Sequence, residues 1–243
     1  MILLRELIRG NPRAIGRALS LVEDGGPEAR RFMKDIRGLR KKAPVVGITG
    51  APGAGKSTLA DGLIGDLRMH GLKVGVVAID PTSPFTGGAV LGDRIRMIRH
   101  SADAGVYIRS MSSRGHRGGL AKASGDVCSV LTAAGMDLIL LETIGVGQGE
   151  VDMIHVADLV LVVLTPESGD DIQTFKSGIM EIADVFVLNK SDLPGAAALE
   201  VQVRGMVELG GPDQPAPLII RTSATDGRGI DLLGAEVRKL VRP

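Results

Sequence analysis

The stretch VVGITGAPGAGKS, residues 45–57, decides the fold. Its first five residues are apolar or small without alternation, which is typical of a strand buried on both faces. The pattern Gly-x4-Gly-Lys-Ser follows, from Gly50 to Ser57, and completes a phosphate-binding loop placed between a strand and a helix. The glycines let backbone N–H groups curl around phosphates, and the helix N-terminus adds partial positive charge. The stretch therefore predicts an α/β domain that binds a nucleoside triphosphate.

Other short apolar runs show the same pattern, because they too lack alternation. They lie at residues 74–79, 138–142, 159–164, 185–189 and 217–221. Segments between them, such as 57–71 and 177–184, can supply crossover helices. Repeated strand–helix units with right-handed crossovers predict a doubly wound, mostly parallel sheet, with ligands at the carboxyl ends of its strands.

The first 43 residues are expected to form a short helical extension, followed by a nucleotide-binding domain over residues 44–243. Ile15, Ala18, Leu19 and Val22 share one helix face. Asn11-Pro12 is a plausible start of that helix and Gly25-Gly26 a plausible stop. A second helix from about Pro27 carries five basic residues: Arg30, Arg31, Lys34, Arg37 and Arg40. These form either a docking surface for a partner or nucleotide, or a solvated helix face.

Charge and cysteine content restrict the class of protein. The formal net charge is +1, which does not indicate a nucleic-acid or membrane-surface partner. Cys128 is the only cysteine, so an internal disulfide and a thiolate-rich metal cluster are excluded. No apolar run approaches the roughly 20 residues that span a bilayer, and charges interrupt any signal-like N-terminus. We expect a cytoplasmic protein.

The string NKSD, Asn189 to Asp192, follows an apolar run and matches the Asn-Lys-x-Asp motif of GTP-binding proteins. That resemblance implies that Asp192 accepts two hydrogen bonds from guanine, that Asn189 braces the loop, and that the Lys190 stem covers the ring. Adenine offers no matching donor pair, and a desolvated carboxylate without partners is costly. Downstream, Ser223-Ala224 resembles the last guanine-contacting motif, in which the Ala N–H meets the base oxygen.

Longer strings resemble one GTPase family more closely. GITGAPGAGKST, IDPTSPFTGGAVLGDRIRM, LETIGVGQGEVDM, GDDIQTFKSGI and LNKSD occur in the order typical of MeaB/ArgK-type GTPases, from roughly residue 10 to 192 and more loosely to the end. The resemblance implies a SIMIBI-type P-loop domain that hydrolyses GTP. It also implies a G-protein chaperone that gates cobalamin loading, protection or exchange in a partner acyl-CoA mutase such as methylmalonyl-CoA mutase.

Several acidic residues acquire metal-site roles from this resemblance. Asp80, Asp93 and Glu142 match the family's magnesium-site carboxylates and would act with the Ser57 hydroxyl, directly or through waters. Mg²⁺ prefers oxygen ligands, and three acids beside a triphosphate would repel it without a cation. The alternative for Asp80 and Glu142 is a strand-ending acid that caps a turn.

Lys56 is expected to reach the β- and γ-phosphates. The nucleotide is expected to contact Gly50, Ala51, Pro52, Gly53, Ala54, Gly55, Lys56, Ser57 and Thr58. By resemblance, Gly145 turns its N–H toward the γ-phosphate and Gln148 is a candidate for orienting the attacking water, or else a polar loop residue.

Two further segments resemble switch or partner regions of the family. Gln173 and Lys176 match positions of an additional switch, and Lys176 is a candidate for a cation supplied to the site when the partner binds. Its alternative is a solvated helix residue. Arg114, His116 and Arg117 depart from the usual family loop, and they either contact nucleotide or partner or face solvent.

Other functions stay open from the sequence alone. A nickel-inserting GTPase needs a Cys/His cluster, which one cysteine and four scattered histidines do not supply. A P-loop kinase for a small molecule is disfavoured by NKSD, and a nucleotide sensor would bind GTP without turnover. Family members usually continue into a helical extension that mediates dimerisation. This sequence ends at Pro243 without it, which puts a homodimer formed by that route in doubt.

Overall fold

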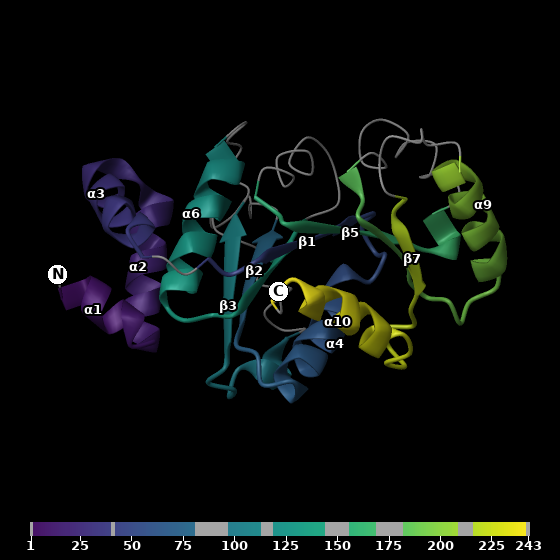
Figure 1. Cartoon of the computed structure of the whole chain (residues 1–243), viewed down its shortest axis with the longest axis horizontal. Coiled ribbons are helices and arrows are strands. Elements are labelled where there is room, and N and C mark those ends of the chain that lie inside the picture. Colours follow the sequence, from purple (N-terminus) through teal and green to yellow (C-terminus); the bar gives the residue numbers. More distant parts are fainter. Residues whose placement is uncertain are drawn as a thin grey trace, which may run out of the picture.

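The computed structural model describes residues 2–39, 42–80, 97–112, 119–143, 156–168, 182–208 and 216–241. Within these residues, seven parallel strands form one sheet in the order β3-β2-β4-β1-β5-β6-β7 (Figure 1). The strands are β1 (Val45–Gly50), β2 (Val74–Asp80), β3 (Val106–Ser112), β4 (Leu138–Glu142), β5 (Leu159–Leu164), β6 (Val185–Leu188) and β7 (Leu218–Arg221). The predicted doubly wound α/β sheet is thereby confirmed.

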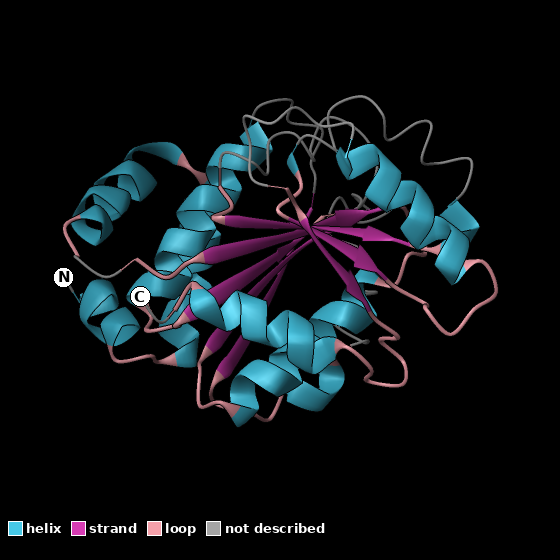
Figure 2. Ribbon diagram, turned by 45° about the vertical axis from the view of Figure 1, so that its right-hand side comes forward, coloured by secondary structure: helices cyan, strands magenta, loops and turns pink. Residues whose placement is uncertain are grey.

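Helices cover both faces of the sheet (Figure 2). They are α1 (Ile2–Ile8), α2 (Pro12–Asp24), α3 (Gly26–Arg37), α4 (Lys56–Met69), α6 (Gly119–Ala133), α9 (Ala196–Glu208) and α10 (Ile230–Lys239), with 3-10 turns η1 (Ile98–His100) and η2 (Pro166–Ser168). α4 and α10 pack on one face, against alternate residues such as Val46 and Ile48. α6 and α1–α3 pack on the other face, where α9 covers β5 and β6.

Two strands differ from the sequence expectation. β3 was not predicted, because its apolar run is only three residues long, Val106 to Ile108, before Arg109 and Ser110 interrupt it. The run at 217–221 was expected to be buried on both faces, which is wrong. It forms β7, an edge strand that pairs only with β6 and leaves Leu218 47% exposed. Both edges of the sheet are thus only partly covered, whereas β1 and β4 are buried along their whole length.

The N-terminal helices follow the predicted signals. Asn11 caps α2, where its Oδ1 accepts from the backbone N–H groups of Arg13 and Ala14 at 3.0 and 3.3 Å. The predicted apolar face of α2 is buried, and it shares one core with α3, α6 and the β2 and β4 strands. Glu23 of α2 accepts from Arg109 of β3 at 2.6 and 2.7 Å, which fixes the extension to the edge strand. The division at residue 43 stays a prediction.

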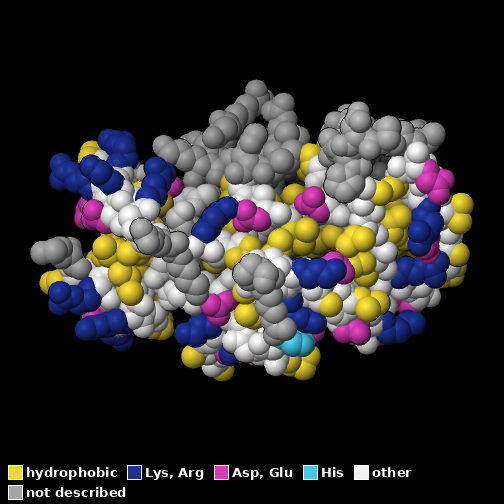
Figure 3. All heavy atoms as spheres, in the orientation of Figure 1, with side chains coloured by type: hydrophobic (Ala, Val, Ile, Leu, Met, Phe, Trp, Pro, Cys, Tyr) yellow, Lys and Arg dark blue, Asp and Glu magenta, His cyan; other side chains and the backbone are white. Residues whose placement is uncertain are grey.

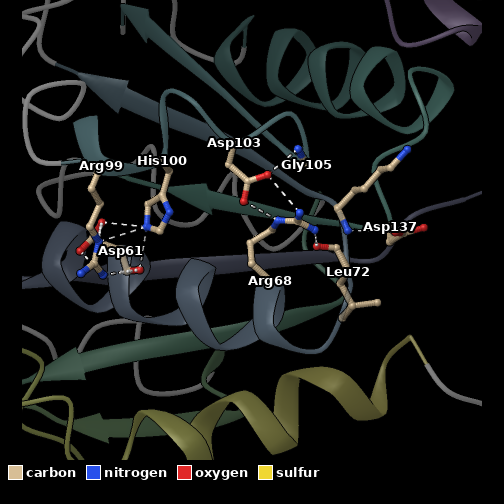
Figure 4. A network of polar contacts seen from close by, with 9 residues as sticks. Asp61, Arg68, Leu72, Arg99, His100, Asp103, Gly105 and Asp137 are labelled. Atoms are coloured by element: carbon tan, nitrogen blue, oxygen red, sulfur yellow. Dashed lines mark hydrogen bonds and ion pairs between the residues drawn. The ribbon is translucent and has the colours of Figure 1, made fainter.

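Two polar networks fix the segment before β3 to α4, the helix that begins in the phosphate loop (Figure 4). Asp61 accepts from Arg99 Nε at 2.8 Å and lies 3.0 Å from His100 Nε2. Arg68 donates to both carboxylate oxygens of Asp103, at 2.8 and 3.0 Å. These bonds hold the pKa of the Asp103 carboxyl below its usual value, chiefly through Arg68. The α4 helix is therefore held against η1 and against the turn before β3, as well as against the sheet.

Some expectations fall outside the described residues. Residues 177–181 of the predicted crossover helix 177–184 are among them, as is Arg40 of the basic helix face. In the described part of the chain, no helix is both long and apolar enough to cross a membrane.

Candidate nucleotide-binding site

The candidate site lies at the carboxyl ends of the central strands. After β1 the chain forms β2, β3 and β4 on one side of β1, and then β5, β6 and β7 on the other side. The carboxyl end of β1 is therefore the topological switch point of the sheet. A cavity of about 540 Å³ opens there. It is lined by Gly53, Gly55, Lys56, Ser57, Thr58, Glu142, Asn189, Lys190, Asp192, Leu193, Ala224 and Thr225. The structure thus brings the phosphate loop and both predicted base-contacting motifs into one cavity.

The phosphate loop curls tightly between β1 and α4. Gly55 has φ +88°, and a Cβ there would lie 2.5 Å from Asn189 Nδ2, so the position admits only glycine without displacement. Lys56, 7% exposed, donates from Nζ to the carbonyl oxygens of Gly50 and Ala51 at 2.8 and 3.0 Å. The ammonium group is therefore held at the mouth of its own loop, where phosphate oxygens would compete for it. Of the other loop residues, Thr58 lines the cavity, Ala51 and Ala54 are buried, and Pro52 is exposed.

A hydroxyl–carboxylate pair joins the phosphate loop to β4. Ser57 Oγ donates to Glu142 Oε1 at 2.7 Å, and both side chains are buried. The hydroxyls of Thr143 and Thr49 lie 3.2 Å apart and connect the ends of β4 and β1. Hard oxygen donors at this spacing are the ligands that Mg²⁺ uses beside phosphates. In the described part of the chain, no group of three or more His, Cys, Asp or Glu side chains is arranged to hold a metal by itself.

Asn189 connects three segments that are distant in sequence. Its Nδ2 donates to Ala54 O in the phosphate loop at 2.8 Å. Its Oδ1 accepts from Thr222 Oγ1 and from the Ala224 N–H, both at 3.1 Å. The side chain is 2% exposed, so these bonds form away from water. Asn189 therefore braces the base loops against the phosphate loop, and the Ala224 N–H is directed to it in this structure.

Asp192 is held in place by a second set of polar contacts. Ser223 Oγ lies 2.7 Å from Asp192 Oδ1 and 3.0 Å from Asp226 Oδ2, so two carboxylates share its single hydrogen. Arg228 donates to Asp226 at 2.6 Å. The hydrogen bond from Arg228, followed by that from Ser223, lowers the pKa of the Asp226 carboxyl. Asp192 is accordingly held in a fixed orientation, and both its carboxylate oxygens keep a lone pair that can accept from a ligand.

Lys190 has an unusual backbone conformation for a non-glycine residue, with φ +54°. Its Nζ lies 2.7 Å from Glu167 Oε2 in η2, and its side chain lines the cavity. Because the left-handed conformation turns the chain sharply, Lys190 and Asp192 can both border the same space. Glu167 was not singled out in the sequence.

Not all predicted site residues can be compared with the structure. Asp80 is the last residue of β2, in register with Ser112 of β3. The following predicted residues lie outside the described residues: Asp93, Gly145, Gln148, Gln173, Lys176, Arg114, His116 and Arg117. Their assigned roles stay predictions.

Two cavity-lining residues were missed by sequence reasoning. Leu193 directly follows the NKSD string, and Thr225 directly follows Ser223-Ala224. The signal was adjacency to a recognised motif, but which flanking residue faces the cavity depends on the turn geometry.

Comparisons with known proteins agree with this geometry. A family model described as "Methylmalonyl Co-A mutase-associated GTPase MeaB" matches residues 15–242. A putative GTPase of Pyrococcus abyssi is 51% identical over 245 residues, which cover 98% of this chain and 74% of that protein. GTPase ArgK of Escherichia coli is 34% identical over 238 residues, 94% of this chain and 72% of that protein. A fused isobutyryl-CoA mutase of Geobacillus kaustophilus is 37% identical over 211 residues, 83% of this chain and 19% of that protein.

Solved structures share the fold. The crystal structure of an LAO/AO transport system kinase superposes with a TM-score of 0.79 at 27% identity, over 98% of this chain and 73% of that one. HypB from Helicobacter pylori in complex with nickel gives a TM-score of 0.59 at 17% identity, over 88% of this chain and 93% of that one, and so supports the fold alone. Together with the parallel sheet, these likenesses confirm the predicted P-loop NTPase fold.

Proposed function

The chain belongs to the MeaB family of methylmalonyl-CoA mutase-associated GTPases, and on that premise we propose that it gates the cobalamin state of an acyl-CoA mutase. The GTPase assignment itself follows from the family and from relatives named as GTPases. The observation that supports the site most strongly is the single cavity that joins the phosphate loop to Asn189, Asp192 and Ala224. A partner mutase is supported by the fused isobutyryl-CoA mutase, in which a region similar to this chain is part of the same polypeptide.

Guanine recognition in this proposal is carried by Asp192. Its carboxylate would accept from the two adjacent donors of guanine, N1–H and the exocyclic amine. Ser223 fixes the orientation of that carboxylate, because its hydroxyl occupies one oxygen at 2.7 Å. Adenine would leave the carboxylate without matching donors inside a confined space, which costs orders of magnitude in affinity.

Phosphate binding is carried by the loop and by Lys56. The β- and γ-phosphate oxygens are charged acceptors, so they would take the ammonium hydrogens now given to Gly50 O and Ala51 O. The residues present fit Mg²⁺, since Ser57 and Glu142 offer a hydroxyl and a carboxylate 2.7 Å apart in the same cavity. Ser57 and Glu142 would hold the ion, Glu142 directly or through water. When bound, Mg²⁺ would neutralise charge that develops on the phosphate oxygens.

Hydrolysis is proposed as an in-line attack of water on the γ-phosphate, promoted by positioning and charge neutralisation. Gln148 is the candidate that orients the water. Lys176 is the candidate cation that a bound partner would bring into the site. With no supplied cation in place, intrinsic turnover is expected to be slow.

The test of the proposed function is GTP turnover with and without cobalamin-dependent mutases. We expect a cognate mutase to bind the chain and to raise turnover, and Lys56→Ala to abolish turnover in both conditions. If Lys56-dependent turnover is present but every such mutase fails to bind or stimulate, the GTPase assignment stands and the partner assignment is wrong.

Two alternatives have less support. Nickel insertion would need a Cys/His cluster, and Cys128 is buried in the core between α6 and the sheet. The solved kinase named above resembles this chain over nearly its whole length, so phosphoryl transfer to a small molecule is a second candidate. A phosphorylated product formed from GTP in place of free phosphate would favour it.

A further inference from the structure

A second concave region lies between α3 and α6, and it shares no lining residue with the nucleotide cavity. One hollow of about 440 Å³ is lined by Val22, Gly25, Gly26, Ala29, Arg30, Met33, Arg37, Ala123 and Asp126. A neighbouring hollow of about 450 Å³ shares Arg37 and Asp126 and continues along α6 to Thr132. We call these two hollows the α3–α6 groove. Residues 123–132 of α6 border it, a length of roughly 15 Å at the rise of an α-helix, or about three helical turns.

The α3–α6 groove has an apolar floor and a basic rim. Val22, Ala29 and Met33 form the floor and are at most 5% exposed. Arg30 and Arg37 lie on the rim and are exposed. Such a surface binds best a segment that carries apolar side chains flanked by charge of the opposite sign.

Charge is segregated around α3. At roughly 100° per residue, the basic residues Arg30, Lys34 and Arg37 fall on the flank that faces the groove. The acidic residues Glu28 and Asp35 fall on the opposite flank. Figure 3 shows Lys and Arg side chains gathered over α3. The basic flank therefore presents a local positive field despite the net charge of only +1.

The cations on this flank are mostly available to a partner. Arg37 forms a long ion pair with Asp126 of α6, at 3.4 Å, and both residues line both hollows. Among the described residues, Arg30 and Lys34 of this flank form no ion pair. An acidic segment could engage Arg30 without breaking an existing contact.

We propose that the α3–α6 groove is the docking site for an acidic helical segment of a partner protein. An apolar strip of that helix packs on the floor, and its flanking carboxylates pair with Arg30 and Arg37. A nucleic acid is the less suitable occupant, because single strands bind by stacking on aromatic side chains and no aromatic residue lines the groove among the described residues. The nearest aromatic of α3, Phe32, is buried in the core.

The test uses defined probes on the whole chain. Three labelled helical peptides of about twelve residues carry the same leucine strip with flanking Glu, Gln or Lys, and a single-stranded oligonucleotide serves as a second polyanion. Binding is measured by fluorescence anisotropy at about 0.15 M salt, where attraction between charges more than about 8 Å apart is screened. We expect the Glu peptide to bind at least about tenfold more tightly than the Gln peptide, and the Lys peptide not to bind.

Variants locate the binding. Arg30→Glu is expected to weaken the Glu peptide about tenfold, because it replaces an attraction with a repulsion. Ala123→Phe, which fills the hollow, is expected to weaken both the Glu and the Gln peptide. Arg31→Glu, the same charge change on the solvent side of α3, is the matched control and should change affinity less than about threefold. Thermal melts by circular dichroism and affinity for a fluorescent GDP check that each variant is folded.

Several results would overturn the proposal. These are equal binding of the Glu and Gln peptides, no binding of any peptide, or an equal loss in Arg31→Glu and Arg30→Glu. Tighter binding of the oligonucleotide than of the Glu peptide would assign the surface to nucleic acid instead. None of these results bears on the mutase proposal, whose test is stimulated GTP turnover.

Discussion

Replacing Asn189 by alanine should weaken both the fold and the nucleotide site. The side chain makes three hydrogen bonds: to Ala54 O at 2.8 Å, and from Thr222 Oγ1 and the Ala224 N–H at 3.1 Å. Ala54 and Thr222 are at most 2% exposed, so water does not replace Asn189 readily as their partner. The substitution leaves three polar groups, one in the phosphate loop and two in the 222–224 segment, without their partner.

The magnitude follows from these contacts. Each lost hydrogen bond with a buried partner costs on the order of 1 kcal/mol, so Asn189→Ala should lower the free energy of unfolding by about 3 kcal/mol. Thr222→Val keeps the shape of its side chain and removes only one of the three bonds. It should therefore cost about 1 kcal/mol. GDP affinity should fall at least about tenfold in Asn189→Ala, because the phosphate loop and the base loops lose their common brace.

Urea unfolding measures the first quantity, with the slope checked for a change in the denatured state. Titration with a fluorescent GDP measures the second. Gly55→Ala provides a cross-check, because its Cβ would lie 2.5 Å from Asn189 Nδ2. Part of the cost of Gly55→Ala should disappear in the Asn189→Ala background. The reasoning is refuted if Asn189→Ala changes the free energy of unfolding by less than about 0.5 kcal/mol and leaves GDP affinity unchanged.

Three further predictions concern other parts of the molecule. Asp103→Asn should lower the free energy of unfolding at pH 7 by about 1 kcal/mol after allowance for solvent screening. The pKa of Asp103 in the folded chain is lowered below its ordinary value of 3.8. The stabilisation is therefore fully present above pH 3.8 and should vanish as the pH falls through the pKa of the folded state. Urea titrations repeated at several pH values measure this. Burial raises the pKa of the Cys128 thiol to about 12. A thiol reagent at pH 8 should therefore react with Cys128 only once urea unfolds the chain. If Cys128 of the folded chain reacted as fast as an exposed free thiol, this prediction would be wrong. Gly50→Ala places a Cβ against the Val163 carbonyl and should lower the free energy of unfolding by about 2 kcal/mol. At Gly53→Ala the new Cβ meets no atom, so this variant should lose only about 1 kcal/mol through backbone strain. Urea unfolding measures both values.

The sequence predicted the interior of the sheet better than its edges. Strands such as β1 and β4 are buried on both faces, and continuous apolar runs reveal them. β3 has only three apolar residues in a row, Val106 to Ile108, and its polar Arg109 pairs with Glu23 of α2. Only the tertiary structure shows that such a segment pairs with β2 and is not a loop.

The candidate site was predictable where its chemistry depends on local spacing. The phosphate loop and NKSD follow their strands as fixed strings, and the cavity joins them. The contacts that hold these motifs together could not be read from spacing, since Ser223 reaches Asp192 across 31 residues of chain and Ser57 reaches Glu142 across 85. Which polar side chains meet at the carboxyl edge depends on strand order, and that order is set by packing of the whole domain.

The most direct test of the central claim is the base preference of Asp192→Asn. An asparagine amide offers one donor and one acceptor in place of two acceptors, and xanthine has a carbonyl where guanine has its exocyclic amine. Dissociation constants for GDP, XDP and ADP should be measured for the native chain and for this variant. We predict that the native chain prefers GDP, and that the variant binds GDP about a hundredfold more weakly and now prefers XDP. An unchanged preference for GDP in the variant would contradict the assignment of this cavity as the guanine site.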